Sequence, residues 1–257
     1  MKKTILVVML MLSILAAPFH VFAQDKLSVA VAANFISAFK EIAADFESKS
    51  GVKVEATFSS TGNLYSQIKN GAPYDVFLSA DEQRPDLLQK EGWTDGTFIY
   101  ARGQAILWSA DPNFCKAPTW QEALKNNRIK KISIANPVTA PYGAAAKAAL
   151  QKTGLWDALQ DKLVNGQDIA QAFQYASTQA VDAGFCALSA AASPQGKNGC
   201  FFSIPEAPDI VQAGCILKKS KNQKCAELLM AYLLGADAAK TKKKYGYRYI
   251  WIILRFM

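Results

Sequence analysis

The chain has 257 residues, of which 51% are hydrophobic and 19% are charged, an ordinary balance for a folded globular protein. Its formal net charge is +8, but the segment from Ile216 to Met257 alone carries ten Lys or Arg against two acidic residues, so the basic character is confined to the end of the chain. The single histidine is His20, which leaves the chain beyond it without an imidazole for a Ser-His-Asp or Cys-His mechanism or for zinc.

The first 23 residues have the layout of a secretory signal peptide. Two lysines precede an apolar run from Thr4 to Ala17, and Ala23 offers a small residue before the cut. This run of about 14 residues is shorter than the roughly 20 that span a bilayer, which disfavours an uncleaved membrane anchor. We therefore expect a mature protein that starts near Gln24 and is located in the periplasm.

Beyond residue 23, the first half of the chain alternates strand and helix patterns. The predicted strands cover residues 27–32, 52–58 and 76–78, and the predicted helices follow Asn34, start at Leu64 and cover 86–92. In the helix after Asn34, apolar residues recur three and four positions apart, and Gly51 ends it. This order is typical of an α/β protein with parallel strands.

The second half of the chain repeats this order and indicates a second lobe. The predicted strands cover residues 104–109, 131–135, 184–188 and 210–217, and the predicted helices start after Thr119, cover 144–152, start at Asp168 and cover 225–234. The first of these strands leads out to the second lobe and the last returns from it. We therefore expect residues 24–104 and 213–257 in lobe 1 and residues 105–212 in lobe 2, with a ligand cleft between them.

Three loops share one design, in which a strand ends, small or hydroxyl residues follow, and a helix begins. They cover residues 32–34, 59–62 and 140–143, and a fourth helix starts at Asp168 and Ile169. Each loop alone is typical of an ordinary helix cap. Together, the helix N-termini would present unpaired N–H groups and partial positive charge, and the side chains of Asn34, Ser60 and Thr61 can add donors. Facing one cleft, such groups bind an anion without any cationic side chain.

Segments spread from Leu27 to Tyr247 resemble the periplasmic molybdate-binding proteins of ATP-driven importers. The matching segments are VAVAANF at 29–35, FSSTG at 58–62, QIKNGAPYDVFLSAD at 67–81, ANP at 135–137, APYG at 140–143, GF at 184–185, ALS at 187–189 and KYGY at 244–247. Among these, the Gly-Ala-Pro-x-Asp-Val-Phe segment with its Ser-Ala-Asp is specific as a set.

The resemblance implies an α/β, two-lobed periplasmic solute-binding fold of type II, with two mixed sheets flanked by helices and the ligand in the interlobe cleft. It implies a substrate-binding component of an ABC importer that binds molybdate or tungstate and delivers it to a membrane permease. The oxyanion-binding residues that it implies are Ala33, Asn34, Ser60, Thr61, Tyr142 and Ile169. Many relatives use a Tyr hydroxyl at the position of Ala187, so we expect Tyr142 to replace that donor.

The chemistry of these loops bears on which anion binds. Sulfate and molybdate are fully ionised at neutral pH and suit a site of donors only, whereas phosphate keeps a proton and needs an acceptor. No carboxylate falls in the three loops, and we interpret Asp75 and Asp81 as helix caps or local pairs. Because sulfate and molybdate differ mainly in size, a sulfate or other oxyanion carrier stays an alternative, and tungstate cannot be told from molybdate.

An enzyme on the same scaffold is disfavoured, because the mature chain has no histidine, no nucleophile motif and no metal-ligand spacing. We expect a monomer with no cofactor, no bound metal cation and no nucleic-acid partner. The lysines at 240, 242, 243 and 244 are interpreted as a solvated last helix turn.

Five cysteines at wide spacings leave room for one or two disulfides in an exported protein, but they do not indicate which residues pair. Cys186 and Cys215 lie in apolar runs and suit the role of small buried hydrophobes. The apolar end from Tyr249 to Leu254 fits an added strand, a partner contact or a frame change in the gene.

Overall fold

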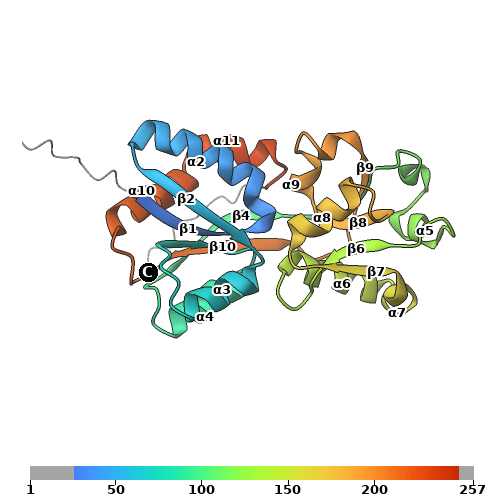
Figure 1. Ribbon diagram of the computed structural model, residues 1–257, viewed down its shortest axis with the longest axis horizontal. Helices are drawn as coiled ribbons and strands as arrows, with labels where there is room; N and C mark the ends of the chain where they lie inside the picture. Colours follow the sequence, from blue (N-terminus) through green and yellow to red (C-terminus); the bar gives the residue numbers. More distant parts are fainter. Residues whose placement is uncertain (1–25, 249–257) are drawn as a thin grey trace, which may run out of the picture.

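The computed structural model describes residues 26–248, which form two lobes lying side by side (Figure 1). Each lobe is a five-stranded mixed sheet with helices on both faces, which confirms the predicted two-lobed α/β fold. None of the helices in the described range is long and apolar enough to cross a membrane. The predicted signal peptide and the apolar segment 249–257 lie outside the described residues.

The first lobe is built on the strand order β2-β1-β3-β10-β4. Its strands are β1 (Lys26–Ala32), β2 (Lys53–Ser59), β3 (Val76–Leu78), β4 (Thr97–Gly103) and β10 (Ile210–Ile216). Its helices are α2 (Ile36–Ser50), α3 (Thr61–Lys69), α4 (Gln83–Lys90), α10 (Gln223–Leu234) and α11 (Ala236–Lys244). In Figure 1, α2, α10 and α11 cover one face of the sheet, and α3 and α4 cover the other. Strands β1, β2 and β3 are parallel, whereas β10 runs antiparallel to β3 and β4.

The second lobe is built on the strand order β7-β6-β8-β5-β9. Its strands are β5 (Ala105–Ser109), β6 (Ile132–Ala135), β7 (Leu163–Gly166), β8 (Ala183–Ala187) and β9 (Cys200–Ser203). Its helices are α5 (Trp120–Lys125), α6 (Pro141–Lys152), α7 (Trp156–Leu159), α8 (Ile169–Ser177) and α9 (Leu188–Ala191), with the short 3-10 helices η3 (Phe114–Lys116), η4 (Gln160–Lys162) and η5 (Gly196–Asn198). Here too the antiparallel strand, β5, lies inside the sheet.

Two connections join the lobes. Gln104 alone separates β4 of the first sheet from β5 of the second, and residues 204–209 lead back from β9 to β10. The sequence predicts residues 24–104 and 213–257 in lobe 1 and 105–212 in lobe 2, and we propose this division with its second boundary moved back to the start of β10. At the second crossing, β10 begins at Ile210 and its first residues already pair with β4.

The hydrophobic pattern accounts for the first helix, α2. Phe39, Ile42 and Phe46 are buried against the first sheet, as their spacing predicts. Gly51 follows the helix at φ 74°, a left-handed conformation that glycine adopts without a steric penalty. The predicted end of this helix is therefore confirmed.

Four helices begin two or three residues earlier in the chain than the sequence pattern predicts, namely α3 at 61, α4 at 83, α6 at 141 and α10 at 223. Helix α3 starts at Thr61 because Ser60 is its N-cap, and α6 starts at Pro141, whose fixed φ suits a first helical position. The loops at 59–62 and 140–143 therefore include the first turns of these helices. Strand β4, which carries Tyr100, was not predicted at all.

The prediction of a solvated lysine turn is wrong for one residue of α11. Lys240, Lys243 and Lys244 are exposed, but Lys242 is buried with 6% of its surface accessible. Its Nζ donates to the carbonyl oxygens of Tyr100 (2.7 Å) and Leu233 (2.8 Å), so it joins strand β4 to the end of α10. Burial lowers the pKa of this ammonium to about 8.

The pKa of Lys242 makes a prediction about pH. Between about pH 8 and 10.5 the unfolded chain still holds this proton whereas the folded protein has lost it, so the free energy of unfolding rises with pH. The gain should reach at most about 3 kcal/mol. Urea unfolding from pH 7 to 10.5 should show this rise in the wild type and not in Lys242→Met. Parallel pH profiles of the two proteins would contradict it.

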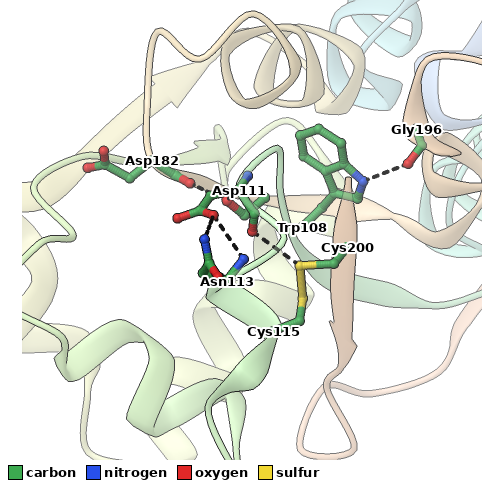
Figure 2. Close-up of a disulfide and its surroundings, with 8 residues drawn as sticks. Trp108, Asp111, Asn113, Cys115, Asp182, Gly196 and Cys200 are labelled. Carbon is green, nitrogen blue, oxygen red and sulfur yellow. Dashed lines mark hydrogen bonds between the residues drawn. A yellow bond between two sulfur atoms is a disulfide. The ribbon is translucent and has the colours of Figure 1, made fainter. Parts of the chain in front are cut away.

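A disulfide joins Cys115, in η3, to Cys200, the first residue of β9 (Figure 2). The two cysteines are 85 positions apart, and nothing in their sequence spacing indicated the pair. The bond ties the loop after β5 to an edge strand at the far end of lobe 2. Cys186 and Cys215 are buried without a disulfide, as their apolar surroundings suggested.

Replacing both Cys115 and Cys200 by Ala should lower the free energy of unfolding by about 2–4 kcal/mol, because the long loop between them is no longer closed in the unfolded chain. Denaturant titration of the variant and the wild type measures the difference. A reductant should bring the wild type to the variant's midpoint and leave the variant unchanged. Equal midpoints without reductant would show that the bond adds no stability.

Candidate functional site

The first predicted site segment, residues 32–34, lies at the end of strand β1. The chain leaves β1 at Ala32 and makes one 3-10 turn, η2 (Ala33–Phe35), before α2 begins. Ala33 and Asn34 are both buried at this turn, with 6% of each residue accessible. The first N–H groups of such a turn have no partner within it.

The second segment lies at the end of the neighbouring strand β2. The Ser60 Oγ accepts a hydrogen bond from the Asn63 N–H (3.3 Å), and the Thr61 Oγ1 accepts one from the Ala80 N–H (2.9 Å). Both residues are buried. Because each hydroxyl oxygen acts as an acceptor here, its own hydrogen stays available, and no described residue accepts it.

The third segment, in lobe 2, brings Tyr142 to the interlobe space. Ala140 is the N-cap of α6, and Pro141 has no N–H, so Tyr142 carries the first free backbone N–H of the helix. The Tyr142 side chain is buried, and its Oη accepts from Gln212 Nε2 (3.1 Å) and Asn34 Nδ2 (3.4 Å) in the other lobe. Gly143 is required next, because a Cβ there would lie 2.1 Å from the Ala135 carbonyl oxygen.

The fourth segment is the start of α8. The Asp168 Oδ1 accepts from the N–H groups of Ala170 (2.9 Å) and Gln171 (3.0 Å), so it is the N-cap, and buried Ile169 is the first helical residue. The Ile169 N–H precedes those that the cap satisfies. The Asp168 carboxylate binds N–H groups at the start of its own helix, so its negative charge acts less on the adjacent interlobe space.

All six predicted site residues line one small cavity of about 10 Å³ between the lobes. The lining residues are Ala32, Ala33, Asn34, Ser60, Thr61 and Ala80 from lobe 1, and Ala140, Pro141, Tyr142, Asp168 and Ile169 from lobe 2. The starts of η2, α3, α6 and α8 therefore meet at one place, two from each lobe. Asp168, which belongs to the fourth predicted helix start, also lines the cavity, and its Oδ1 caps α8.

The hydrogen-bond donors around the cavity are uncharged hydroxyl and amide groups. Its lining contains no Lys or Arg. Burial raises the pKa of Tyr142 well above its usual value, so this hydroxyl keeps its proton. A cavity this small excludes organic ligands of ordinary size, whose sites measure about 300–1,000 Å³. The chemistry therefore suits a small anion.

Contacts across the cleft hold the lobes together around this cavity. The Gly62 N–H donates to the Thr139 carbonyl oxygen (2.8 Å), and Arg84 Nη2 donates to the Val138 carbonyl oxygen (3.0 Å). A Cβ at Gly62 would lie 3.0 Å from the Thr139 Cα, so glycine permits this approach. The lobes must separate for any ligand to enter, and these contacts would break.

A buried polar layer behind the cavity escaped the sequence analysis. It consists of Tyr100, Ser189, Gln212 and Tyr247. The Asn34 carbonyl oxygen accepts from both the Tyr247 Oη (2.7 Å) and the Ser189 Oγ (2.8 Å), and Tyr100 Oη lies 3.0 Å from Gln212 Oε1. A usable signal existed for Gln212, since it is the one polar side chain in the apolar run 210–217. The others carried no such signal.

Ala187, the position where relatives are expected to have Tyr, does not line the small cavity. It lines an adjoining groove of about 530 Å³ that also touches Ala33, Asn34 and Ile169. A longer side chain at 187 would occupy that groove beside Asn34. The replacement of this donor by Tyr142 stays a prediction. A cavity of about 940 Å³ is at a different place, around Trp93 and Asp75 in lobe 1.

Two lobes joined by two crossing connections, with a small cavity lined by residues of both lobes, define a two-lobed ligand-binding protein. The description "bacterial extracellular solute-binding protein" matches residues 27–248, and the chain belongs to this family.

Two curated relatives carry the name molybdate-binding protein ModA. The protein from Azotobacter vinelandii is 45% identical over 228 residues, covering 86% of this chain and 89% of the relative. The protein from Rhodobacter capsulatus is 38% identical over 229 residues, covering 88% and 89%. A solved structure, the periplasmic molybdate-binding protein of Azotobacter vinelandii, superposes with a TM-score of 0.83 at 34% identity and covers 87% of this chain and 99% of that one. The resemblance inferred from the sequence is thereby confirmed.

Replacing Tyr142 by Phe should weaken binding of an oxyanion by about 1–3 kcal/mol, because one donor is lost and two amide N–H groups lose their acceptor. Titration calorimetry measures the change. Tyr74→Phe is the matched control, since its hydroxyl donates to Gln67 on the surface of lobe 1 (2.7 Å). Unchanged affinity in Tyr142→Phe would mean that α6 contributes through its backbone alone.

Proposed function

We propose that this protein is the extracytoplasmic substrate-binding component of an ABC importer and that it binds molybdate, and tungstate equally, in the cavity between its lobes. The observation that carries this proposal is the set of three hydroxyl groups around the cavity, on Ser60, Thr61 and Tyr142. The Ser60 and Thr61 hydroxyls each accept one N–H and the Tyr142 hydroxyl accepts two, and each of the three keeps its hydrogen to offer to a ligand.

The backbone supports the same ligand class. Four helix starts border the cavity, and each has leading N–H groups and the partial positive charge of a helix N-terminus. The proposed oxyanion-binding residues are Ala33 and Ile169 through the backbone, Ser60, Thr61 and Tyr142 through hydroxyls, and Asn34 through its backbone. The Asn34 Nδ2 is engaged by three neighbouring side chains, so we assign no direct side-chain contact to it.

The relatives narrow the ligand to molybdate. A site of hydroxyl and N–H donors accepts any fully ionised tetrahedral oxyanion, and sulfate remains the alternative on chemistry alone. Phosphate keeps a proton and needs an acceptor, and Asp168, whose Oδ1 caps α8, is a carboxylate that lines the cavity, so it is the names of the relatives that weigh against phosphate. The names of the curated relatives favour molybdate over sulfate.

The location, oligomeric state and membrane partner of the protein follow from its proposed role in transport. We propose that residues 1–23 direct the protein to the periplasm, that it acts as a monomer, and that it delivers its ligand to the membrane permease of the importer. We assign it no catalytic activity, no cofactor and no nucleic-acid partner. Molybdate is the cargo of the site and no metal cation is bound by protein ligands.

Calorimetric titration of the purified protein with molybdate, tungstate, sulfate and phosphate tests the proposal. Molybdate and tungstate should bind with similar affinity, because they are nearly equal in size and charge, and both should bind far more tightly than sulfate or phosphate. Tight sulfate binding without molybdate binding would replace the leading proposal by its alternative. Heat release with none of the four anions would refute an oxyanion carrier altogether.

A further inference from the structure

Gln212 lies at the centre of the buried layer behind the cavity. It is fully buried in β10, the strand that carries the chain back into lobe 1. Its Nε2 donates to the Tyr142 Oη (3.1 Å), and its Oε1 accepts from the Asn34 Nδ2 (2.9 Å). One side chain therefore joins the two residues that reach the cavity from opposite lobes.

The contact with Gln212 determines what the Tyr142 hydroxyl can do. The Tyr142 oxygen accepts from Gln212 Nε2 and, at the longer distance of 3.4 Å, from Asn34 Nδ2. A hydroxyl whose two lone pairs face N–H groups has only its hydrogen left to offer. With the Gln212 amide turned over, its Oε1 would take that hydrogen, and Tyr142 would present a lone pair to the cavity.

The orientation of the Gln212 amide is set by Asn34, and that of Asn34 by Tyr247. The Tyr247 hydroxyl gives its hydrogen to the Asn34 carbonyl oxygen at 2.7 Å, so a lone pair faces the Asn34 amide 3.1 Å away. A nitrogen must therefore stand at that position of the Asn34 side chain. The same Nδ2 also donates to Gln212. The Gln212 oxygen must therefore face Asn34, which leaves the Gln212 nitrogen facing Tyr142.

The unpaired oxygen of the Asn34 side chain supports this orientation of the Asn34 and Gln212 amides. Asn34 Oδ1 is the one buried side-chain nitrogen or oxygen between residues 26 and 248 that has no hydrogen-bond partner. Leaving an acceptor unpaired destabilises a protein, so the contacts on the Nδ2 side must outweigh that loss to hold the amide in place. Turning Asn34 over would set its oxygen against the oxygens of both Gln212 and Tyr247.

Steric fit leaves the pair little freedom. A Cβ at Gly103, the last residue of β4, would lie 1.9 Å from the Tyr142 Oη and 2.6 Å from Gln212 Nε2. The hydrogen bond between the lobes thus passes directly over a glycine backbone. Any larger residue at 103 would force Tyr142 and Gln212 apart.

We propose that Gln212 is a positioning residue for the oxyanion: it holds the Tyr142 hydroxyl with its hydrogen directed to the cavity, and thereby selects ligands that carry no proton of their own. This inference rests on the proposed function. The residue touches no ligand itself and acts through Tyr142. Donation runs from the Asn34 Nδ2 to the Gln212 Oε1 and from the Gln212 Nε2 to the Tyr142 Oη, and Tyr247, which accepts from the same Nδ2, fixes the orientation of the Asn34 amide.

A double-mutant cycle tests the inference with molybdate as the probe. Gln212→Met should lower the affinity roughly 5- to 30-fold, since Tyr142 is then free to rotate its hydrogen away. In a Tyr142→Phe background the same substitution should change affinity by less than about twofold, because the group through which Gln212 acts is gone. Gln67→Met is the matched control, as it removes a surface Gln–Tyr hydrogen bond and should leave affinity unchanged.

A second variant keeps the test decisive if Gln212→Met does not fold. In Gln212→Glu, compared at pH 6 and pH 10 because burial raises the pKa of a carboxyl group, the ionised carboxylate can only accept, so at the higher pH the Tyr142 hydrogen turns toward it and the cavity gains a lone pair. The ratio of molybdate to phosphate affinity should fall at least roughly tenfold, because phosphate still carries a proton to donate. Thermal unfolding without ligand shows whether each variant is folded.

The outcomes separate the two proposals. Independent affinity losses for Gln212→Met and Tyr142→Phe in the cycle would overturn the positioning role. A Gln212→Glu protein with the wild-type ratio of molybdate to phosphate affinity would also overturn it. In both cases, molybdate binding by the wild type would still support the proposed carrier function. A wild-type protein that binds no oxyanion would overturn the carrier and this inference with it. Coupled losses together with a lower affinity ratio are the result we expect.

Discussion

Unpaired backbone N–H groups at helix starts are the constraint on which the rest of this structure depends. Buried N–H groups without a partner are costly, so a fold that buries several at one point must supply an acceptor there. In this protein η2, α3, α6 and α8 all begin at the edge of one small cavity between the lobes. An anion is the ligand that satisfies such a set, because it offers acceptors in every direction.

Small residues make this convergence sterically feasible. The apolar cluster between the lobes consists largely of alanines, among them Ala33, Ala80 and Ala140, with Tyr142 and Ile169 as its larger members. Short side chains let the two lobes bring their backbones close together, and Gly62 and Gly143 permit the tightest approaches. The result is that four helix starts border one small cavity, whereas larger side chains would keep these helix starts apart.

Neutral groups also form the layer behind the cavity. Burial raises the pKa values of Tyr100, Tyr142 and Tyr247, so all three hydroxyls stay protonated. Lys242, a buried cation near this layer, donates hydrogen bonds to two carbonyl oxygens, one of which belongs to Tyr100. The lining of the cavity holds no Lys or Arg and its carboxylate, Asp168, caps α8, so the proposed oxyanion would be held by hydrogen-bond donors and helix N-termini without a cationic side chain.

The sequence by itself determined the alternation of strands and helices, the two-lobed α/β fold and the four segments that meet at the cavity. These follow from local signals: apolar periodicity, N-cap residues at 60 and 168, and a glycine after α2. The tertiary structure alone decided the Cys115–Cys200 pair, the burial of Lys242, strand β4 and the layer of Tyr100, Gln212 and Tyr247. Each of these depends on partners that are far away in the chain, and a local pattern carries no information about which distant group a side chain will meet once the two lobes close.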